Sequence, residues 1–345
     1  RISPAVKIRT HHYTLQPGPD PWRAARSPRH GALMAITFDE GTTGYADLHP
    51  WEEFGHAPLD NHLASLAAGQ PTPLAALALR HARTDAAARR AGVSLFDGLP
   101  EVHSHALFTD WTKAPRSAFE QCVADGYRAV KLKIGKDPEG EAKALNELAD
   151  LPLRWRLDAN AQGRDERPAR PLDPVRTSGP LVPTQFLAQL SADTRHNIEF
   201  LEDPMPYAGP AWSNLAEREK VRLALDWELP SSPPPWPGAQ TLVLKPAVQD
   251  AFPLALAAAH AGMELVVTHS MDHPLGQSVA LWTAMRLRQR HGELLLDGGL
   301  HGAGLYSAGE FSEQIHTRGP QTVPPPGTGF GFDGLLEKLP WKTLP

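Results

Sequence analysis

From about residue 105 onward, short apolar runs alternate with stretches of helical spacing, and this alternation constrains the fold more than any other feature of the chain. The predicted strands are His103–Phe108, Tyr127–Ile134, Arg154–Ala161, Asn197–Asp203, Arg222–Glu228, Thr241–Lys245, Glu264–Thr268 and Glu293–Leu296. The helices expected between them include Ser117–Asp125, Glu139–Asp150, Ala251–Ala261 and Leu275–Arg290, and Arg164–Pro183 is an expected insertion. Such alternation builds right-handed βαβ units on a parallel sheet. Residues 106–310 are therefore predicted to form an α/β domain of the (β/α)8-barrel type.

Residues 1–105 have a different texture, which predicts a small α+β domain. The expected elements are the hairpin strands Val6–Leu15 and Gly31–Phe38, the loop Gly41–Glu53 and the helices Leu59–Gly69 and Pro73–Gly92. Residues 311–345 carry enough apolar side chains to pack back on this domain. We therefore expect a capping domain, 1–105, that is completed by 311–345 and lies beside the barrel.

Composition excludes several classes of function. The 345 residues carry a formal net charge of -5 with charges interspersed, which does not indicate a nucleic-acid partner. The single cysteine, Cys122, excludes an internal disulfide and fits a reducing compartment. No apolar run approaches the roughly 20 residues of a membrane span, and residues 1–10 lack the apolar core of a signal peptide. These features predict a cytoplasmic protein without a membrane partner.

Charged residues stand at the ends of five successive predicted strands. In chain order they are Lys131 and Lys133, Asp158, Glu202, Asp226 and Lys245. The two lysines of the first pair are two residues apart, so in a strand they point to the same face. Glu202 shares its face with the apolar Ile198 and Phe200 and is expected to point inward, whereas Asp203 then faces the surrounding helices. Barrel enzymes carry their active sites at this end of the strands.

Three carboxylates on neighbouring strands repel one another at short range, and a hard divalent cation relieves this repulsion. Oxygen ligands without a nearby histidine or cysteine indicate Mg²⁺, with Mn²⁺ as a substitute. The lysines would flank the metal from opposite sides. A partly desolvated lysine near other cations has a lowered pKa, which suits it to remove a proton from carbon. Separate surface ion pairs or helix caps would explain any one of these residues, but not the whole ordered set.

The order Lys-x-Lys, Asp-x-Asn, Glu-Asp-Pro, Asp and Lys-Pro resembles the enolase superfamily in its muconate-lactonising branch, whose members use a Lys or His base with Mg²⁺. Within that branch, the segments 130–135, 156–160 and 223–226 are most similar to the o-succinylbenzoate synthase family. The chain departs from the family at one point. Trp227 separates Asp226 from Glu228, where the family usually has Asp-Glu in tandem, so a supporting role of Glu228 stays open.

The resemblance implies a role for each charged residue. The implied metal ligands are Asp158, Glu202 and Asp226. Lys133 is the implied base and then acid, Lys245 an electrostatic stabiliser across the substrate, Lys131 a neighbour that lowers the pKa of Lys133, and Arg156 a support of the lysine side. The distal carboxylate of the substrate is expected near His269, Ser270 and Gly276, where a helix cap is an equally good explanation. The loops Gly18–His30 and Gly44–Gly55, with His49 and Trp51, are expected to close over the barrel mouth and set specificity.

The resemblance further implies a small carboxylate substrate and a reaction. The reaction is the syn-dehydration of 2-succinyl-6-hydroxy-2,4-cyclohexadiene-1-carboxylate to 2-succinylbenzoate in menaquinone biosynthesis. An N-acylamino acid racemase or a dipeptide epimerase needs the same metal and the same opposed lysines, although 296–299 lacks the Asp-x-Asp usual in dipeptide epimerases. A muconate cycloisomerase and a catalytically silent scaffold are further alternatives. The sequence does not predict the oligomeric state.

Overall fold

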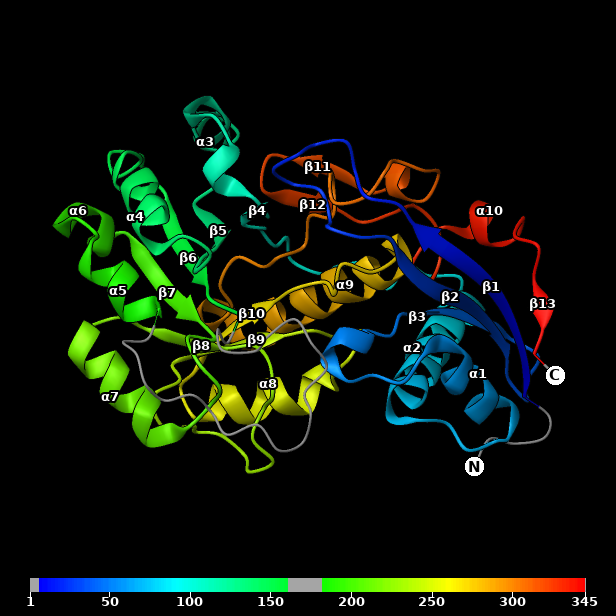
Figure 1. The fold of residues 1–345 in the computed structure, drawn as a ribbon. Helices are drawn as coiled ribbons and strands as arrows, with labels where there is room; N and C mark the ends of the chain where they lie inside the picture. Colours follow the sequence, from blue (N-terminus) through cyan, green and yellow to red (C-terminus); the bar gives the residue numbers. More distant parts are fainter. Residues whose placement is uncertain (1–5, 161–181, 345) are drawn as a thin grey trace.

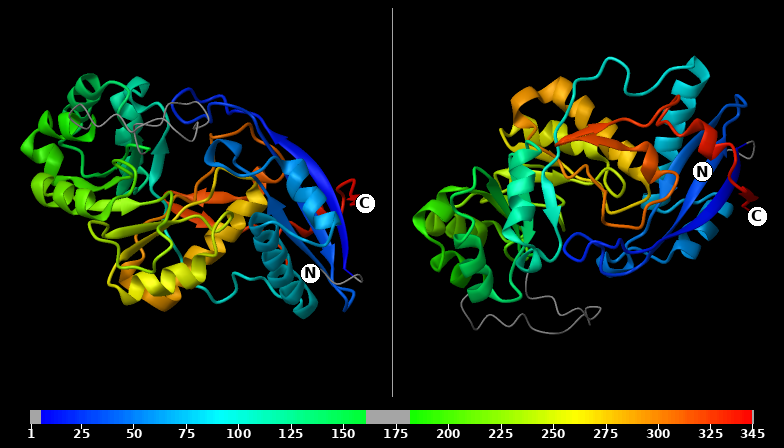
Figure 2. Two further views of the ribbon diagram at one scale, coloured as in Figure 1. Left: turned by 60° about the horizontal axis from the view of Figure 1, so that its bottom comes forward. Right: turned by 90° about the horizontal axis from the view of Figure 1, so that it is seen from above.

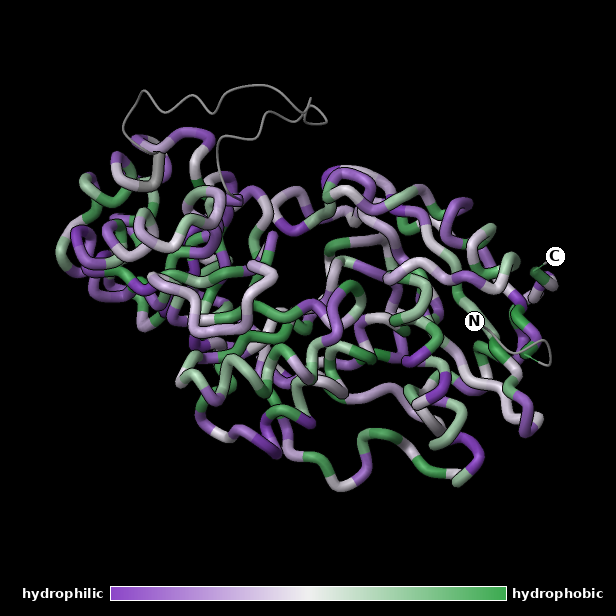
Figure 3. Tube along the Cα trace, turned by 90° about the horizontal axis from the view of Figure 1, so that it is seen from below, coloured by the Kyte–Doolittle hydropathy of each residue, from purple (hydrophilic) through white to green (hydrophobic). Residues whose placement is uncertain are grey.

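The computed structural model describes residues 6–160 and 182–344 (Figure 1). The predicted insertion Arg164–Pro183 lies outside these residues except for its last two, which begin helix α5. Within the described residues, no helix combines the length and the apolar character needed to cross a membrane. Figure 3 agrees with this finding, because hydrophobic and hydrophilic residues alternate along most of the trace.

The barrel domain contains a seven-stranded parallel sheet in the order β10-β9-β8-β7-β6-β5-β4. Its strands are β4 (Ala106–Phe108), β5 (Ala129–Lys133), β6 (Arg154–Asp158), β7 (Ile198–Glu202), β8 (Leu223–Leu225), β9 (Thr241–Leu244) and β10 (Glu264–Val267). The helices are α3 (Arg116–Ala124), α4 (Pro138–Asn146), α5 (Val182–Ala188), α6 (Ala192–His196), α7 (Gly209–Glu219), α8 (Ala251–His260) and α9 (Pro274–His291), with the short η2 (Trp111–Lys113) after β4. The predicted fold class is confirmed, with strands shorter than their apolar runs.

The predicted eighth strand, Glu293–Leu296, is wrong. Its first residues belong to the short helix η3 (Gly292–Leu294), and the following segment 295–299 forms only isolated bridges. These bridges reach both edges of the sheet: the Gly299 N–H donates to the Val267 carbonyl on β10, and the Gly298 N–H donates to the His103 carbonyl before β4. Glycine permits this approach, since a Cβ on Gly298 would lie 2.5 Å from the Val267 carbonyl oxygen. Segment 295–299 thus closes the ring without being a regular strand.

An apolar layer inside the barrel explains why the charged residues point inward. Phe200, Ala224, Val243 and Val266 are buried in one cluster, one from each of four neighbouring strands. Side chains two residues apart on a strand share a face. The residues two positions further along the chain are Glu202, Asp226, Lys245 and Thr268, so they lie above this layer at the carboxyl ends of the strands.

The capping domain is a four-stranded antiparallel sheet covered by two helices, and Figure 2 shows it beside the barrel. Its sheet order is β13-β1-β2-β3. Part of the predicted loop Gly41–Glu53 is in fact strand β3, whose residues alternate between buried and half-buried. The loop assignment failed because β3 carries few bulky apolar side chains. The elements are β1 (Lys7–Leu15), β2 (Arg29–Thr37), β3 (Thr43–Leu48), η1 (Glu52–Phe54), α1 (Leu59–Ala67), α2 (Pro73–Ala91) and β13 (Lys342–Thr343).

The C-terminal segment first passes the end of α3, where Gly319 packs against the Asp125 carbonyl, and then runs along the capping domain. It contains η4 (Ser312–Gln314), the hairpin of β11 (His316–Arg318) and β12 (Gln321–Val323), and α10 (Asp333–Leu336), and it ends in β13. Strand β13 pairs with β1, and the rings of Trp341 and Tyr45 lie 5.7 Å apart. The Arg89 guanidinium on α2 contacts both Asp85 and Asp333. These contacts hold the end of the chain on the domain formed by its beginning.

Candidate active site

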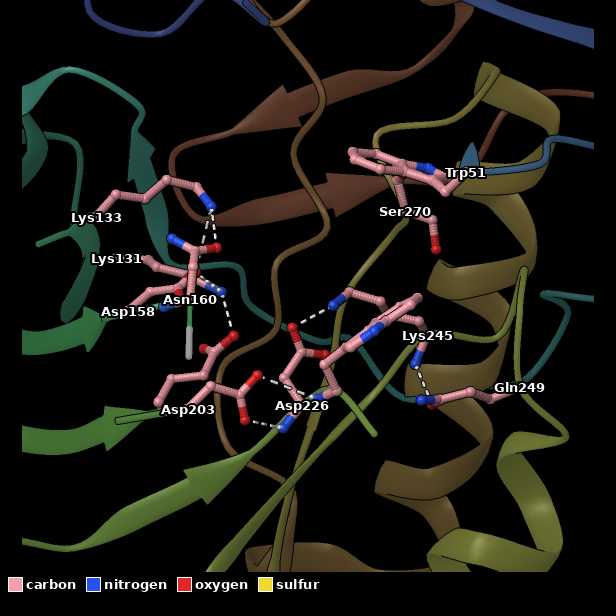
Figure 4. A network of polar contacts seen from close by, with 12 residues as sticks. Trp51, Lys131, Lys133, Asp158, Asn160, Asp203, Asp226, Lys245, Gln249 and Ser270 are labelled. Carbon is pink, nitrogen blue, oxygen red and sulfur yellow. Dashed lines mark hydrogen bonds and ion pairs between the residues drawn. The ribbon is translucent and has the colours of Figure 1, made fainter. Parts of the chain in front are cut away.

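The sequence-predicted charged residues meet at the carboxyl ends of neighbouring strands. Lys133 pairs in register with Asp158, and Asp158 pairs with Glu202. Asp226 and Lys245 directly follow β8 and β9. Figure 4 shows Lys133 and Lys245 on opposite sides of the group, with acidic side chains between them.

Each of the three predicted metal ligands contacts a lysine. The Lys131 ammonium lies 2.6 Å from Glu202 Oε1 and 3.1 Å from Asp158 Oδ2. Lys133 Nζ lies 3.5 Å from the same Asp158 oxygen, and Lys245 Nζ pairs with Asp226 Oδ2. Lys133 has the most accessible side chain of the three lysines, at 29% exposed against 11% for Lys131. Lys133 is therefore the lysine best placed to reach a molecule in the barrel mouth.

Lys131 is a buried cation that the acids keep charged. Burial alone lowers the pKa of a lysine, but Asp158, Glu202 and Asp226 outweigh that effect and raise the pKa of Lys131. Lys131 shares an oxygen of Asp158 with Lys133. Lys131 thus places a permanent positive charge next to Lys133.

The carboxylates have the chemistry of a site for a hard cation. Burial and the nearby charges of Asp158 and Asp226 raise the pKa of Glu202, although Lys131 acts in the opposite direction. Burial also opposes ionisation of Asp158, but Lys131 and Lys133 outweigh it and lower its pKa. Asp226 Oδ1 is buried and has no hydrogen-bond partner among the described residues. In the described part of the chain, no three His, Cys, Asp or Glu side chains are arranged around a common metal position, and the lysines pair with the acids instead.

Two polar residues at the site have contacts that the sequence reasoning did not predict. Asn160, with a left-handed φ of 49°, accepts a hydrogen bond of 2.8 Å from Lys133 Nζ. Asp203 does not face the helices as expected. Its φ of 43° turns the carboxylate toward the end of β8, where it accepts the backbone N–H groups of Asp226 and Trp227 at 3.1 and 3.2 Å. In the sequence, the only signals for these two positions are the motifs Asp-x-Asn and Glu-Asp-Pro.

Arg156 lies one layer below the charged rim. It pairs in register with Lys131 and is 1% exposed. Its Nε donates to Glu199 at 2.5 Å, and Nη1 lies 2.8 Å from Nδ1 of His105. A register shift between β6 and β7 at Trp155/Arg156 brings Glu199 into this position. The structure therefore places Arg156 under the lysine side, inside the barrel.

The predicted substrate-contact segment lies where the capping domain meets the barrel. Trp51 Nε1 donates a hydrogen bond of 2.9 Å to the Ser270 carbonyl, and Ser270 Oγ is buried with no partner among the described residues. His269 Nδ1 accepts the Met271 N–H, and burial lowers the pKa of His269 to about 4. Gly276 is packed, since a Cβ there would lie 2.4 Å from Asp272 Oδ2.

His49 lies behind the mouth rather than in it. Its side chain is buried, its Nδ1 lies 2.8 Å from the Tyr13 hydroxyl, and burial lowers its pKa to about 3. Trp51 is half-buried and stays at the mouth (Figure 4).

Known proteins resemble this chain in sequence and in fold. Residues 8–88 match the family described as O-succinylbenzoate synthase, N-terminal domain. A Bdellovibrio bacteriovorus protein named o-succinylbenzoate synthase is 31% identical over 347 residues, which cover 98% of this chain and 99% of the relative. A Roseovarius nubinhibens structure assigned to the mandelate racemase/muconate lactonizing enzymes, solved with magnesium, has a TM-score of 0.68 at 20% identity and covers 94% of both chains. The L-Ala-D/L-Glu epimerase of Bacillus subtilis has a TM-score of 0.69 at 15% identity and covers 94% of this chain and 97% of its own. At such identities the two structures establish the fold alone.

Proposed function

The chain belongs to the o-succinylbenzoate synthase family of the enolase superfamily, and from this membership we propose the reaction and the role of each site residue. The chain is an enzyme of the hydro-lyase class. The proposed substrate is 2-succinyl-6-hydroxy-2,4-cyclohexadiene-1-carboxylate, and the product is 2-succinylbenzoate, an intermediate of menaquinone biosynthesis. The observation that carries this proposal is the pair Lys133 and Lys245 on opposite sides of acidic side chains that include Asp158 and Asp226, in a chain 31% identical to its relative over nearly its whole length.

Lys133 is the proposed base. In its neutral form, the amine takes the proton from the carbon next to the substrate carboxylate, and the resulting ammonium then gives that proton to the departing hydroxide. The carbon–hydrogen and carbon–oxygen bonds break, a ring double bond forms, and water leaves. Two observations support this role: Asn160 and Asp158 hold Nζ at the barrel mouth, and Lys133 has the most accessible side chain of the three site lysines.

Asp158, Glu202 and Asp226 are the proposed ligands of Mg²⁺, which Mn²⁺ would replace. Their support is an all-oxygen donor set and the unpartnered buried Oδ1 of Asp226. The ion, when bound, supplies positive charge at the substrate carboxylate, where negative charge develops during proton removal. Lys245 adds a second positive charge from the opposite side of the mouth.

A racemase or epimerase of N-acylamino acids or dipeptides is the second candidate. The opposed lysines favour it, because two bases on opposite faces of one carbon exchange its configuration. The fold shared with the Bacillus subtilis epimerase is compatible with it.

Purified protein with Mg²⁺ and the cyclohexadiene substrate distinguishes these candidates. We expect the ultraviolet band of the diene to disappear and aromatic proton signals of the product to appear. The absence of both, together with deuterium exchange at the α-carbon of N-acylamino acids or dipeptides, would instead establish the racemase or epimerase.

A further inference from the structure

Trp227 lies at the carboxyl end of the barrel sheet, and hydrogen bonds hold the backbone of its turn. It follows Asp226 directly after β8, and the backbone conformation is restricted at both neighbouring residues. Asp203 accepts the N–H groups of Asp226 and Trp227, and Glu228 has a left-handed φ of 54°. A turn fixed by two hydrogen bonds gives the indole a defined place at the mouth.

The indole lies next to one of the two site lysines. Lys245 Nζ is 5.4 Å from the centroid of the Trp227 ring, within the range of a cation–π interaction. The same ammonium also pairs with Asp226 Oδ2. Lys245 carries its charge on a flexible four-carbon stem, so the ring and the carboxylate together restrict where that charge lies.

The indole also meets the capping domain. The ring of Phe54, in η1, lies 4.4 Å from the Trp227 ring and 5.0 Å from the Trp51 ring. Trp51 is anchored to the barrel by its hydrogen bond to the Ser270 carbonyl, and the Arg29 guanidinium stacks 3.6 Å from its ring centre. The three aromatic rings therefore form a continuous row from the capping loop to Lys245.

Phe54 is unusual in its exposure. Among the described residues, three large hydrophobic side chains are exposed: Phe54 at 41%, Val93 at 46% and Leu256 at 48%. Of these, Phe54 is the one that contacts aromatic groups at the barrel mouth. A role in contacting Trp227 would explain why this large hydrophobic side chain is exposed.

We propose that Trp227 is a positioning residue for Lys245 and that Phe54 holds Trp227 in place, so that seating of the capping loop sets the position of the Lys245 ammonium. This inference rests on the proposed function, in which Lys245 stabilises developing charge. The row of rings joins the capping loop to Lys245, a group that acts on the proposed reaction. Trp227 thus makes kcat, more than KM, depend on how the capping loop is seated on the barrel.

A double-mutant cycle tests the proposal. Trp227→Leu removes the aromatic face, and we expect kcat to fall about tenfold while KM changes less than about threefold, as for loss of one cation–π contact. Trp227→Phe keeps an aromatic face and should retain most of kcat. Phe54→Ala should lower kcat less, and the Phe54→Ala/Trp227→Leu double variant should match Trp227→Leu alone, because Phe54 acts through Trp227.

Several results would overturn the proposal: an unchanged kcat in Trp227→Leu, equal loss in Trp227→Phe, or additive losses in the double variant. Urea unfolding verifies that each variant is folded, and if Trp227→Leu is not, Trp227→Phe and Phe54→Ala carry the test. Leu256→Ala truncates a similarly exposed hydrophobic side chain on α8; it is the matched control for Phe54→Ala and should leave kcat unchanged. If the wild-type enzyme makes no aromatic product, the proposed function has failed, and the same cycle is then measured on deuterium exchange, which separates the two failures.

Discussion

Lys131 and Glu202 form an ion pair of 2.6 Å inside the barrel mouth, with side chains only 11% and 2% exposed. Lys131 also contacts Asp158 at 3.1 Å, so one ammonium forms ion pairs with two buried carboxylates. Removing one partner of such a pair leaves the other charge buried and unpaired.

Replacing Lys131 with methionine should therefore destabilise the folded protein. We expect a loss of about 3–5 kcal/mol in the free energy of unfolding without Mg²⁺. Urea unfolding measures this loss. Lys136→Met is the control, since the Lys136 side chain is 56% exposed and lies 3.9 Å from its acidic partner. Equal stability of the two variants would contradict the buried pair.

Asp272 should make stability depend on pH. It is fully buried beside Asp47, and burial raises its pKa to about 7. The folded chain then keeps a proton that the unfolded chain releases near its ordinary pKa of about 3.9, so the stability from this group is lost as pH rises toward 7. The stability advantage of Asp272→Asn over wild type should therefore be larger at pH 8 than at pH 5, by roughly 2–4 kcal/mol in the free energy of unfolding.

Urea unfolding at pH 5, 6.5 and 8 measures this difference. The exposed Asp60 in α1 provides the control, and Asp60→Asn should show no such pH dependence. A constant difference between wild type and Asp272→Asn across the three pH values would show that Asp272 is ionised throughout.

Divalent-ion binding should depend on the three carboxylates at the strand ends. Chelation by EDTA should abolish turnover, and Mg²⁺ or Mn²⁺ should restore it. In calorimetric titrations, Asp226→Asn should weaken Mg²⁺ binding at least about tenfold, in line with the loss of a charged oxygen ligand. Asp110 is the control, because its carboxylate lies beyond β4 and pairs with Lys113. The variant Asp110→Asn should bind Mg²⁺ as tightly as wild type does. Unchanged affinity in Asp226→Asn would remove it from the ligand set.

The period of two along a strand explains why the charged rim could be predicted. Phe200 is buried in the apolar layer inside the barrel, and Glu202 follows two residues later on the same face. The same rule places Lys131 and Lys133 on one face. These inferences need only local alternation, which the sequence contains.

Other features depend on backbone geometry and distant contacts, and sequence reasoning missed them. Asp203 leaves the strand with a positive φ, so the period of two no longer applies to it. Segment 295–299 makes hydrogen bonds to both edges of the sheet, and the pattern of apolar residues does not indicate such pairing. The row of Trp51, Phe54 and Trp227 joins residues far apart in the chain, and the sequence offers only the unexpected tryptophan as a signal.

The most direct test of the account is the turnover of Lys133→Ala, followed by proton NMR with the cyclohexadiene substrate and Mg²⁺, beside calorimetry of Mg²⁺ binding. Because Lys133 is the proposed base and not a metal ligand, the account predicts no detectable 2-succinylbenzoate while Mg²⁺ affinity stays within about threefold of wild type. Aromatic product formed at a rate near that of the wild-type enzyme would contradict it.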